Sequence, residues 1–404
     1  MAKAVIFLAD GMADEPIPEL DGKTPLEAVD TPAMDSIAQR GASGTMFTLP
    51  EGFPTSSDAA NMSVLGYRLA SFYPGRGPIE AASQGIPLRD DDVAWRCNLV
   101  TVSPDGLMQD YSAGHIDNDV SRRLIADLQH EFGSDKLTFY PGVSYRNLLI
   151  LHGREFSDKI DYAKPDSSHG IPIDQLQLTP RDDSEAARHT VEFLTELDRK
   201  TAAFLAQHPL NRGKASPANR IWPWSPGRRP NFTPFAEKYS GKTAAVISAV
   251  DVIRGIAKCA AMDVIIVPGA TGFIDTNYEG KAQAAIDALK THDLVYLHVE
   301  AIDEVSHMGD LKLKMKAIRD FDQRIVAPVM KACGDQVVYA VLPDHPVPLR
   351  LRAHTRTPVP VAICGPGFRP DGIQSYSEKL APGGTLGALK EDEFIRLVLG
   401  LRRP

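Results

Sequence analysis

An aspartate and a histidine, Asp344 and His345, directly follow the apolar run QVVYAVL. His354 comes after a short proline-bearing loop. Burying a carboxylate or an imidazole at the end of a strand costs free energy unless the group has a partner. A metal ion, a catalytic pair or an ordinary hydrogen bond would each supply one.

Other apolar runs end in groups of the same kind. AVIFLA leads into Asp10, and DLVYLHV leads into EAIDEVSHMGD, which contains Asp303 and His307. In a helix this spacing puts both side chains on one face, with Cβ atoms about 5–6 Å apart. Each residue alone has an ordinary interpretation as a turn or capping aspartate, a surface pair or a structural histidine.

Taken together, the three acids and three histidines indicate a metal centre. Oxygen and imidazole ligands without thiolates suit manganese, magnesium or zinc, and a set of this size suits two ions. Two such ions about 3.5–4 Å apart are used in enzymes for phosphoryl displacement. The pattern therefore favours phosphoryl transfer.

A candidate nucleophile lies in PTSSDAANMSVLGY. We expect a short helix from Asp58 to Leu65, with Ser57 as its N-cap and Gly66 as its C-terminal cap. A plain capping role is one interpretation of Ser57. The other is a nucleophile, because an oxygen there meets unpaired N–H groups and the positive end of the helix dipole.

The middle of the chain offers cationic groups. WSPGRRPNF places Arg228 and Arg229 in a tight loop, where guanidinium groups could hold a phosphate. His115 and Arg146 are further candidates for substrate contacts. Adjacent arginines on a loop are also compatible with simple solvation.

The elements that must position these residues are short apolar runs separated by helical patterns. AVIFLA, AAVISAV, DLVYLHV and QVVYAVL lack strict alternation and indicate strands buried on both faces. Helical patterns are seen over 31–40, 184–207 and 312–331. We predict an α/β protein with a core formed by 1–73 and 236–404 and an inserted domain over 74–235.

Composition limits the classes of partner. The chain has 404 residues and a formal net charge of -8, which argues against binding to nucleic acid or an anionic membrane. Its four cysteines have no CxxC spacing, so we expect reduced thiols and a cytoplasmic protein. Neither a signal peptide nor a membrane-spanning run is recognised.

Five motifs together resemble the archaeal-type cofactor-independent phosphoglycerate mutases of the alkaline phosphatase superfamily. They are AVIFLADGMADEPIPELDGKTPLEAVDTPAMD, TSSDAANMSVLGY, VISAVDVIRGIAKCAAMDVIIVPGATGFIDTNYEGKAQAA, EAIDEVSHMGD and LPDHPVPLRLRAHTRTPVPV. The resemblance covers essentially the whole chain. It implies a mixed or parallel sheet sandwiched by helices, with an inserted α+β domain that binds substrate.

The resemblance also implies roles for residues. Asp303, His307 and His354 would bind one metal, and Asp10, Ser57, Asp344 and His345 the other. Ser57 would become transiently phosphorylated, His115 would lie near the transferred group, and Arg228 and Arg229 would hold the substrate phosphate. The segment KPDSSHGIPID departs from the family pattern, and Arg96 in AWRCNLVT receives no role.

These roles imply interconversion of 3-phosphoglycerate and 2-phosphoglycerate, with a small phosphorylated substrate and no 2,3-bisphosphoglycerate. Manganese is the first expectation for the two divalent ions, with magnesium, cobalt and zinc as alternatives. Two other functions stay open: a homoserine kinase-like phosphotransferase of threonine biosynthesis on the same scaffold, and a metal-stabilised binding protein without turnover. The sequence gives no indication of oligomeric state.

Overall fold

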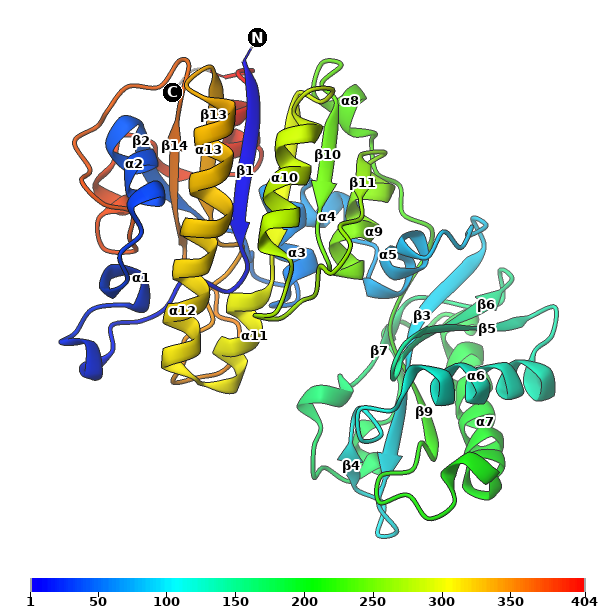
Figure 1. Cartoon of the computed structure of the whole chain (residues 1–404). Helices are drawn as coiled ribbons and strands as arrows, with labels where there is room; N and C mark the ends of the chain where they lie inside the picture. The colour runs from blue at the N-terminus through cyan, green and yellow to red at the C-terminus, as the bar shows by residue number, and fades with distance from the viewer. Residues whose placement is uncertain (1, 403–404) are drawn as a thin grey trace. The chain divides into compact units, whose positions relative to one another are not determined.

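The computed structural model describes residues 2–402 and divides into two units (Figure 1). The core unit contains the residues up to Tyr73 and those from Phe232 onward. The inserted unit is Pro74–Asn231. The first boundary lies where the sequence analysis placed it, and the second lies four residues earlier, at 231/232 instead of 235/236.

The core unit is built on an eight-stranded sheet with the order β11-β10-β12-β1-β13-β14-β2-β15. Its strands are β1 (Lys3–Ala9), β2 (Ala42–Met46), β10 (Ala244–Ile247), β11 (Asp263–Ile265), β12 (Leu294–Val299), β13 (Val337–Leu342), β14 (Val359–Cys364) and β15 (Gly387–Leu389). β14 is antiparallel to both of its neighbours, and the other pairings are parallel.

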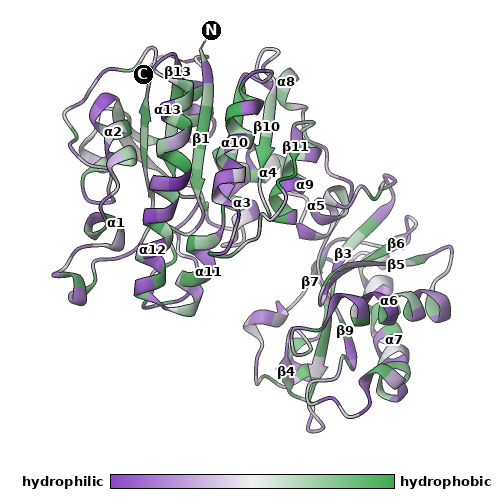
Figure 2. Cartoon of the chain, viewed as in Figure 1, coloured by the Kyte–Doolittle hydropathy of each residue, from purple (hydrophilic) through white to green (hydrophobic). Residues whose placement is uncertain are grey.

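The central strands are buried on both faces, as the uninterrupted apolar runs predict. β1, β12 and β13 are almost fully buried along their lengths, and Figure 2 shows mainly hydrophobic colouring on β1. Such strands occur where helices cover both faces of a parallel sheet. The predicted α/β class and mixed sheet are therefore confirmed.

Helices cover this sheet on both sides. They are α1 (Pro25–Ala28), α2 (Pro32–Arg40), α3 (Ser57–Val64), α4 (Leu69–Phe72), α8 (Phe235–Lys238), α9 (Asp251–Cys259), α10 (Tyr278–Ala288), α11 (Ala301–Met308), α12 (Leu311–Phe321), α13 (Ala327–Cys333) and α14 (Glu393–Val398). Side chains of α2, α10, α12 and α13 share one apolar core with β1, β12 and β13.

The helix expected over 312–331 is interrupted by a π-helical segment, Asp322–Val326, between α12 and α13. The buried Asp322 carboxylate accepts hydrogen bonds from the backbone N–H groups of Ala33 and Met34, at 3.3 and 2.7 Å. These are otherwise unpaired donors at the start of α2. A side chain distant in sequence thus caps α2, which no local pattern predicts.

The inserted unit has its own antiparallel sheet, with β9 and β6 on either side of β3, β5 beyond β6, and β4 at the end of β3. Its strands are β3 (Asp92–Val102), β4 (Met108–Asp110), β5 (Leu137–Val143), β6 (Arg146–His152) and β9 (Arg220–Gly227), with a separate pair β7 (Ile160–Asp161) and β8 (Thr179–Pro180). Its helices are α5 (Arg76–Ser83), α6 (Asn118–Phe132) and α7 (Glu185–Gln207).

The two faces of the inserted sheet differ. On one face, alternate residues of β3, Val93, Trp95, Cys97 and Leu99, pack into a large apolar core with α6 and α7. The other face has two small apolar clusters, one around Ala94 and one around Val100. Arg96 and Asn98 lie between them on the same face, because side chains alternate along a strand.

Among the described residues, no helix combines the length and the apolar composition needed to cross a bilayer.

A buried ion pair, Lys314 with Asp14, anchors the loop that carries His354. The Lys314 ammonium lies 2.8 Å from Asp14 Oδ2 and donates to the Val347 carbonyl at 3.0 Å. The Asp14 carboxylate also accepts from the Leu349 N–H. The backbone of the loop between His345 and His354 is therefore fixed by hydrogen bonds to the buried side chains of Lys314 and Asp14.

Replacing Lys314 by Met leaves the Asp14 carboxylate buried without its cation, so we expect the free energy of unfolding to fall by about 3–5 kcal/mol. Denaturant unfolding measures this loss. The matched control is Lys316→Met on the same helix, because the Lys316 side chain is 51% exposed and its partner Asp320 also lies near Arg324, and a change within about 0.5 kcal/mol is expected there. An equal change in the free energy of unfolding for the two substitutions would contradict a stabilising role of the buried Lys314–Asp14 ion pair.

Candidate active site

The carboxyl ends of three neighbouring strands bring the strand-end acids together. β12, β1 and β13 are parallel and adjacent, with Ala9 opposite Val299 and Leu8 opposite Leu342. Asp10 follows β1, Asp344 follows β13, and α11, which carries Asp303, starts just after β12. Ligand sites of open α/β sheets commonly lie at this edge.

Asp10, Asp344 and His345 form a fully buried group. His345 Nε2 lies 3.4 Å from Asp10 Oδ1 and 3.4 Å from Asp344 Oδ2. The Asp344 carboxylate accepts from the backbone N–H groups of Gly11 and His345, at 3.2 and 2.8 Å. Its orientation is therefore fixed by the backbone of both strand ends.

Asp303, His307 and His354 form a second group beside the first. His307 Nε2 lies 3.4 Å from Asp303 Oδ2 and 2.9 Å from His354 Nε2, and His354 Nε2 lies 3.4 Å from Asp303 Oδ1. The His345 and His354 rings stack with centroids 3.8 Å apart, so the two groups are contiguous. The predicted helical spacing of Asp303 and His307 is the one found in α11.

Gly11 allows this close approach. Its φ of +65° is left-handed, and a Cβ there would lie 2.7 Å from the Cα of Asp303. Any other residue would push α11 away from the end of β1.

Ser57 joins the same cluster, although its local structure differs from the expectation. It is the first residue of α3 and not the N-cap, a position that Ser56 occupies. The prediction was wrong by one residue because both serines satisfy the same capping pattern. Ser57 Oγ lies 3.2 Å from His345 Nε2. All seven residues predicted as metal ligands are therefore neighbours in the core unit.

The buried carboxylates of the cluster repel one another, and added positive charge would stabilise them in their ionised form. Burial, followed by repulsion from Asp344 and Asp303, raises the pKa of Asp10 well above its usual value. Burial likewise raises the pKa of Asp344 to about 7. Burial and the neighbouring His354 lower the pKa of His345, so its imidazole is neutral. Neutral imidazole and ionised carboxylate are the forms that bind cations.

Asp303 and His307 behave as a coupled pair. Burial alone would raise the pKa of Asp303, but hydrogen bonds with His307 and His354 bring it well below its usual value. Burial alone would lower the pKa of His307, but its hydrogen bond with Asp303 raises it to about 9. Binding of a cation here would therefore release a proton from His307.

The residues present fit divalent cations. The buried atoms Asp10 Oδ1 and Asp303 Oδ1 lack a hydrogen-bond partner in the described structure. Ligand atoms of Asp10, Asp344 and His345 lie within 4.8 Å of one another, as do those of Asp303, His345 and His354. Ligands about 2.0–2.4 Å from one ion have separations of that size. A third group, Glu300, Asp303 and Glu304, shares Asp303.

Three side chains that the sequence analysis missed support this cluster. His298 Nε2 lies 3.0 Å from Asp10 Oδ2, and its Nδ1 lies 3.2 Å from Ser248 Oγ. The Asn61 amide donates to Asp344 Oδ2 at 2.8 Å, and Tyr296 O–H donates to Asn61 Oδ1. A histidine within the apolar run of β12 was the available signal for His298. Asn61 lies one helical turn after Ser57.

The residues predicted to contact substrate lie in the inserted unit, in two places. Arg228 donates to the Phe156 carbonyl at 2.7 Å and lies 3.6 Å from Asp158, while Arg229 lies 3.2 Å from the exposed Asp90. His115 and Arg146 instead flank Tyr145, with a ring separation of 6.3 Å and a guanidinium-to-ring distance of 4.9 Å. The two pairs are not brought into one group.

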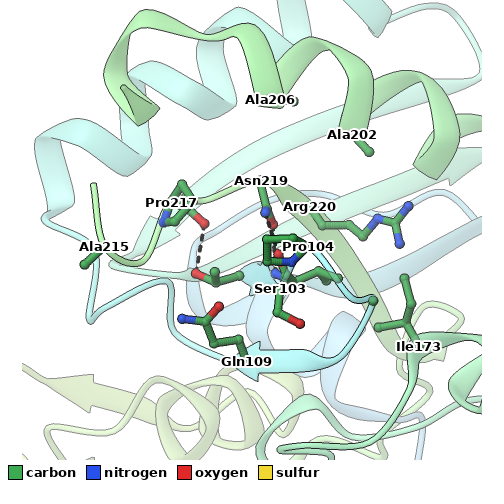
Figure 3. A pocket seen from close by; sticks show the side chains of 13 residues that line it. Ser103, Pro104, Gln109, Ile173, Ala202, Ala206, Ala215, Pro217, Asn219 and Arg220 are labelled. Carbon is green, nitrogen blue, oxygen red and sulfur yellow. Dashed lines mark hydrogen bonds between the residues drawn. The ribbon is translucent and has the colours of Figure 1, made fainter. Parts of the chain in front are cut away.

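A cavity of about 530 Å³ in the inserted unit contains none of the predicted residues (Figure 3). Small residues of α7, Ala202 and Ala206, form part of its wall. Its one cationic lining residue, Arg220, lies 3.3 Å from Asp198. This cavity offers no cluster of ionisable groups comparable to that in the core unit.

The raised pKa of Asp10 makes the metal-free chain sensitive to pH. A carboxyl group whose pKa is higher in the folded state binds more protons there, so stability is lost as pH rises above about 4. Asp10→Asn removes the buried charge, and we expect it to stabilise the chelator-treated protein by about 1–4 kcal/mol at pH 8. The gain should shrink as pH falls to 5.

Urea unfolding between pH 5 and pH 8 measures this effect. Asp335→Asn is the control, because Asp335 is exposed in its pair with Arg40. A gain for Asp10→Asn that is independent of pH would show that charge burial is not its cause.

Comparison with known proteins identifies the family of this chain. A family model described as 2,3-bisphosphoglycerate-independent phosphoglycerate mutase matches residues 38–211. A relative of that name from Methanosarcina acetivorans is 47% identical, covering 98% of this chain and 99% of the relative. A probable 2,3-bisphosphoglycerate-independent phosphoglycerate mutase from Geobacter sulfurreducens is 46% identical, covering 99% of this chain and 100% of the relative.

Solved structures show the same similarity over the full length. A protein from Pyrococcus horikoshii has a TM-score of 0.82 at 28% identity, covering 99% of this chain and 97% of that one. A cofactor-independent phosphoglycerate mutase from Thermoplasma acidophilum has a TM-score of 0.68 at 27% identity, covering 99% of this chain and 100% of that one. From the near-complete coverage and the identity to these relatives, the chain belongs to the 2,3-bisphosphoglycerate-independent phosphoglycerate mutase family.

Proposed function

We propose that this protein is an isomerase that interconverts 3-phosphoglycerate and 2-phosphoglycerate through a phosphoserine at Ser57, without 2,3-bisphosphoglycerate. The observation that carries the proposal is the position of Ser57 Oγ, 3.2 Å from His345 Nε2 at the edge of a buried carboxylate and imidazole cluster. A serine among such ligands has little use in a purely structural metal site.

Two divalent cations, manganese first, would be held by the two groups of ligands. Asp10, Ser57, Asp344 and His345 would bind one, and Asp303, His307 and His354 the other. Bound there, the cations would lower the pKa of the Ser57 hydroxyl and neutralise charge on the phosphoryl oxygens.

Two in-line displacements would follow, with Ser57 Oγ as the nucleophile of the first and the leaving group of the second. In the first, its Oγ forms a bond to phosphorus while the bond from phosphorus to the substrate oxygen breaks, and the released oxygen takes a proton to give glycerate. In the second, the other hydroxyl of glycerate loses its proton and forms a bond to phosphorus while the bond from phosphorus to Ser57 Oγ breaks, and the released Oγ takes up a proton to regenerate Ser57. The N–H groups at the start of α3 favour the negative charge that Ser57 carries in both steps.

The inserted unit would hold the glycerate between the two steps. The residues proposed for this are His115 and three arginines suited to a carboxylate and a phosphate, Arg146, Arg228 and Arg229. Water must be excluded meanwhile, because hydrolysis of the phosphoserine would release the phosphoryl group. The place of such a reaction is glycolysis or gluconeogenesis, in the cytoplasm.

The homoserine kinase alternative uses the same core and another acceptor. The mutase is favoured because the relatives reported above carry that name over nearly the whole chain. An enolase-coupled assay with 3-phosphoglycerate, run beside an assay with homoserine and phosphoryl donors, tests both. Turnover with 3-phosphoglycerate is expected, and turnover with homoserine alone would overturn the proposal.

Ser57→Ala should reduce mutase turnover at least about a thousandfold, because it removes the hydroxyl proposed to accept the phosphoryl group. Mass spectrometry of the acid-quenched wild-type protein should detect a phosphate on Ser57. Manganese binding should persist in the variant, since the other ligands remain. Ser63→Ala, on the same helix with its hydroxyl bonded to the Ala59 carbonyl, is the control. A Ser57→Ala protein with substantial activity would refute the covalent route.

His298→Phe removes the ring nitrogen that orients Asp10 while keeping a ring of similar size. Groups that orient a metal ligand usually contribute 10–100-fold in affinity, so a loss of about that size is expected for manganese. Calorimetric titration of the chelator-treated protein measures it. His292→Phe is the control, because His292 pairs with Asp263. Unchanged manganese affinity would show that His298 has only a packing role.

A further inference from the structure

The inserted unit contains an arginine cluster, Arg76, Arg96 and Arg146, that the proposed mechanism leaves without a full explanation. Arg96 lies on β3, on the face of the sheet opposite α6 and α7. Arg146 at the start of β6 pairs with Asn98, so its side chain is on the same face as Arg96. Arg76 is the first residue of α5.

Glu80 serves two of these guanidinium groups through one oxygen. Glu80 Oε1 lies 3.3 Å from Arg96 Nη1 and 3.2 Å from Arg76 Nη2. The two guanidinium groups therefore lie side by side around one oxygen, and an anion placed next to them would be stabilised by their positive charge.

An aromatic ring holds Arg96 and Arg76 in place. The Trp224 ring lies 4.5 Å from the Arg96 guanidinium carbon and 5.8 Å from that of Arg76. The Trp224 N–H donates to Asn98 Oδ1 at 3.0 Å, which fixes the ring. The guanidinium groups are therefore preorganised, which lowers the entropy cost of binding a ligand.

Arg96 itself has an unused donor. Its residue is 3% exposed, and its Nε is buried without a hydrogen-bond partner. A buried, charged N–H group without an acceptor costs free energy unless a ligand or a water molecule accepts its hydrogen bond. Burial, together with repulsion from Arg76 and Arg146, lowers the pKa of Arg96 to about 10 despite the attraction of Glu80.

Exposure increases from the floor of the cluster to its rim. Arg96 is buried, the Arg76 side chain is 27% exposed, and Arg146 is exposed. Arg146 also lies over the Tyr145 ring, and the His115 ring centroid is 6.3 Å from that of Tyr145. The exposed side of the cluster is therefore the side of Arg146.

We infer that Arg96 forms the floor, and Arg76 and Arg146 the rim, of a binding site for one oxyanion group of a small acid, a carboxylate or a phosphate. This inference rests on the proposed function for the identity of the acid. It adds a second anion site to the one expected at Arg228 and Arg229, which lie 3.6 Å from Asp158 and 3.2 Å from Asp90.

The experiment measures binding of D-glycerate and of inorganic phosphate, separately, to the full-length manganese-loaded protein by calorimetry. Arg146→Gln and Arg96→Lys are compared with wild type. Arg146 is exposed, so its replacement should not affect folding, and Arg96→Lys keeps the charge but loses the planar fork. Arg220→Gln, on β9 and paired with Asp198, is the matched control.

Both cluster variants should weaken one of the two probes by about tenfold or more, the effect of losing a charge-assisted hydrogen bond. Loss confined to D-glycerate assigns a carboxylate to the site, and loss confined to phosphate assigns a phosphate. The Michaelis constant for 3-phosphoglycerate should rise in parallel. The control should bind both probes like wild type.

Affinities for both probes within about twofold of wild type in both cluster variants would overturn the inference and leave Arg96 as part of a structural ion pair. This result is distinct from failure of the proposed function. A wild-type protein without mutase turnover, whose probe binding is still lost in Arg146→Gln, would keep the anion site and reject the mutase.

Discussion

The structure of the core unit depends on one electrostatic constraint: Asp10, Asp303 and Asp344 are buried within reach of one another. Carboxylates placed this close repel, and burial adds a desolvation cost, so the pKa of Asp10 rises well above its usual value. His307, whose pKa is raised to about 9 by its hydrogen bond with Asp303, offsets part of this charge. Divalent cations would offset the rest, which is why the proposed chemistry requires them.

Sheet topology produces this crowding. β12, β1 and β13 are parallel neighbours, so each strand delivers its following residues to the same edge. Gly11 lets α11 approach the end of β1, and Lys314 secures the loop before His354. The free-energy cost of burying several charges at this edge is thus offset by contacts elsewhere in the core unit, such as those of Gly11 and Lys314.

Much of this was predictable from the sequence. A carboxylate directly after a run of buried residues marks the end of a strand, and α11 keeps its ligands at helical spacing, so local patterns identified Asp10, Asp303 and Asp344. Support from His298, Asn61 and Tyr296 was not predictable, since it depends on which strands are neighbours. Partners of arginines are equally non-local: the conspicuous pair Arg228 and Arg229 is bonded to acids, whereas the inconspicuous Arg96 has a buried, unpaired nitrogen.

In the proposed mechanism, side chains from Asp10 to His354 surround two cations, with Ser57 Oγ among the ligands. Anomalous diffraction at the manganese absorption edge, from crystals grown with manganese, would locate these cations. Two peaks about 3.5–4 Å apart are expected, one beside Asp10, Asp344 and His345 and one beside Asp303, His307 and His354. Peaks elsewhere in the molecule, or Ser57 Oγ turned away from both, would contradict the proposed mechanism.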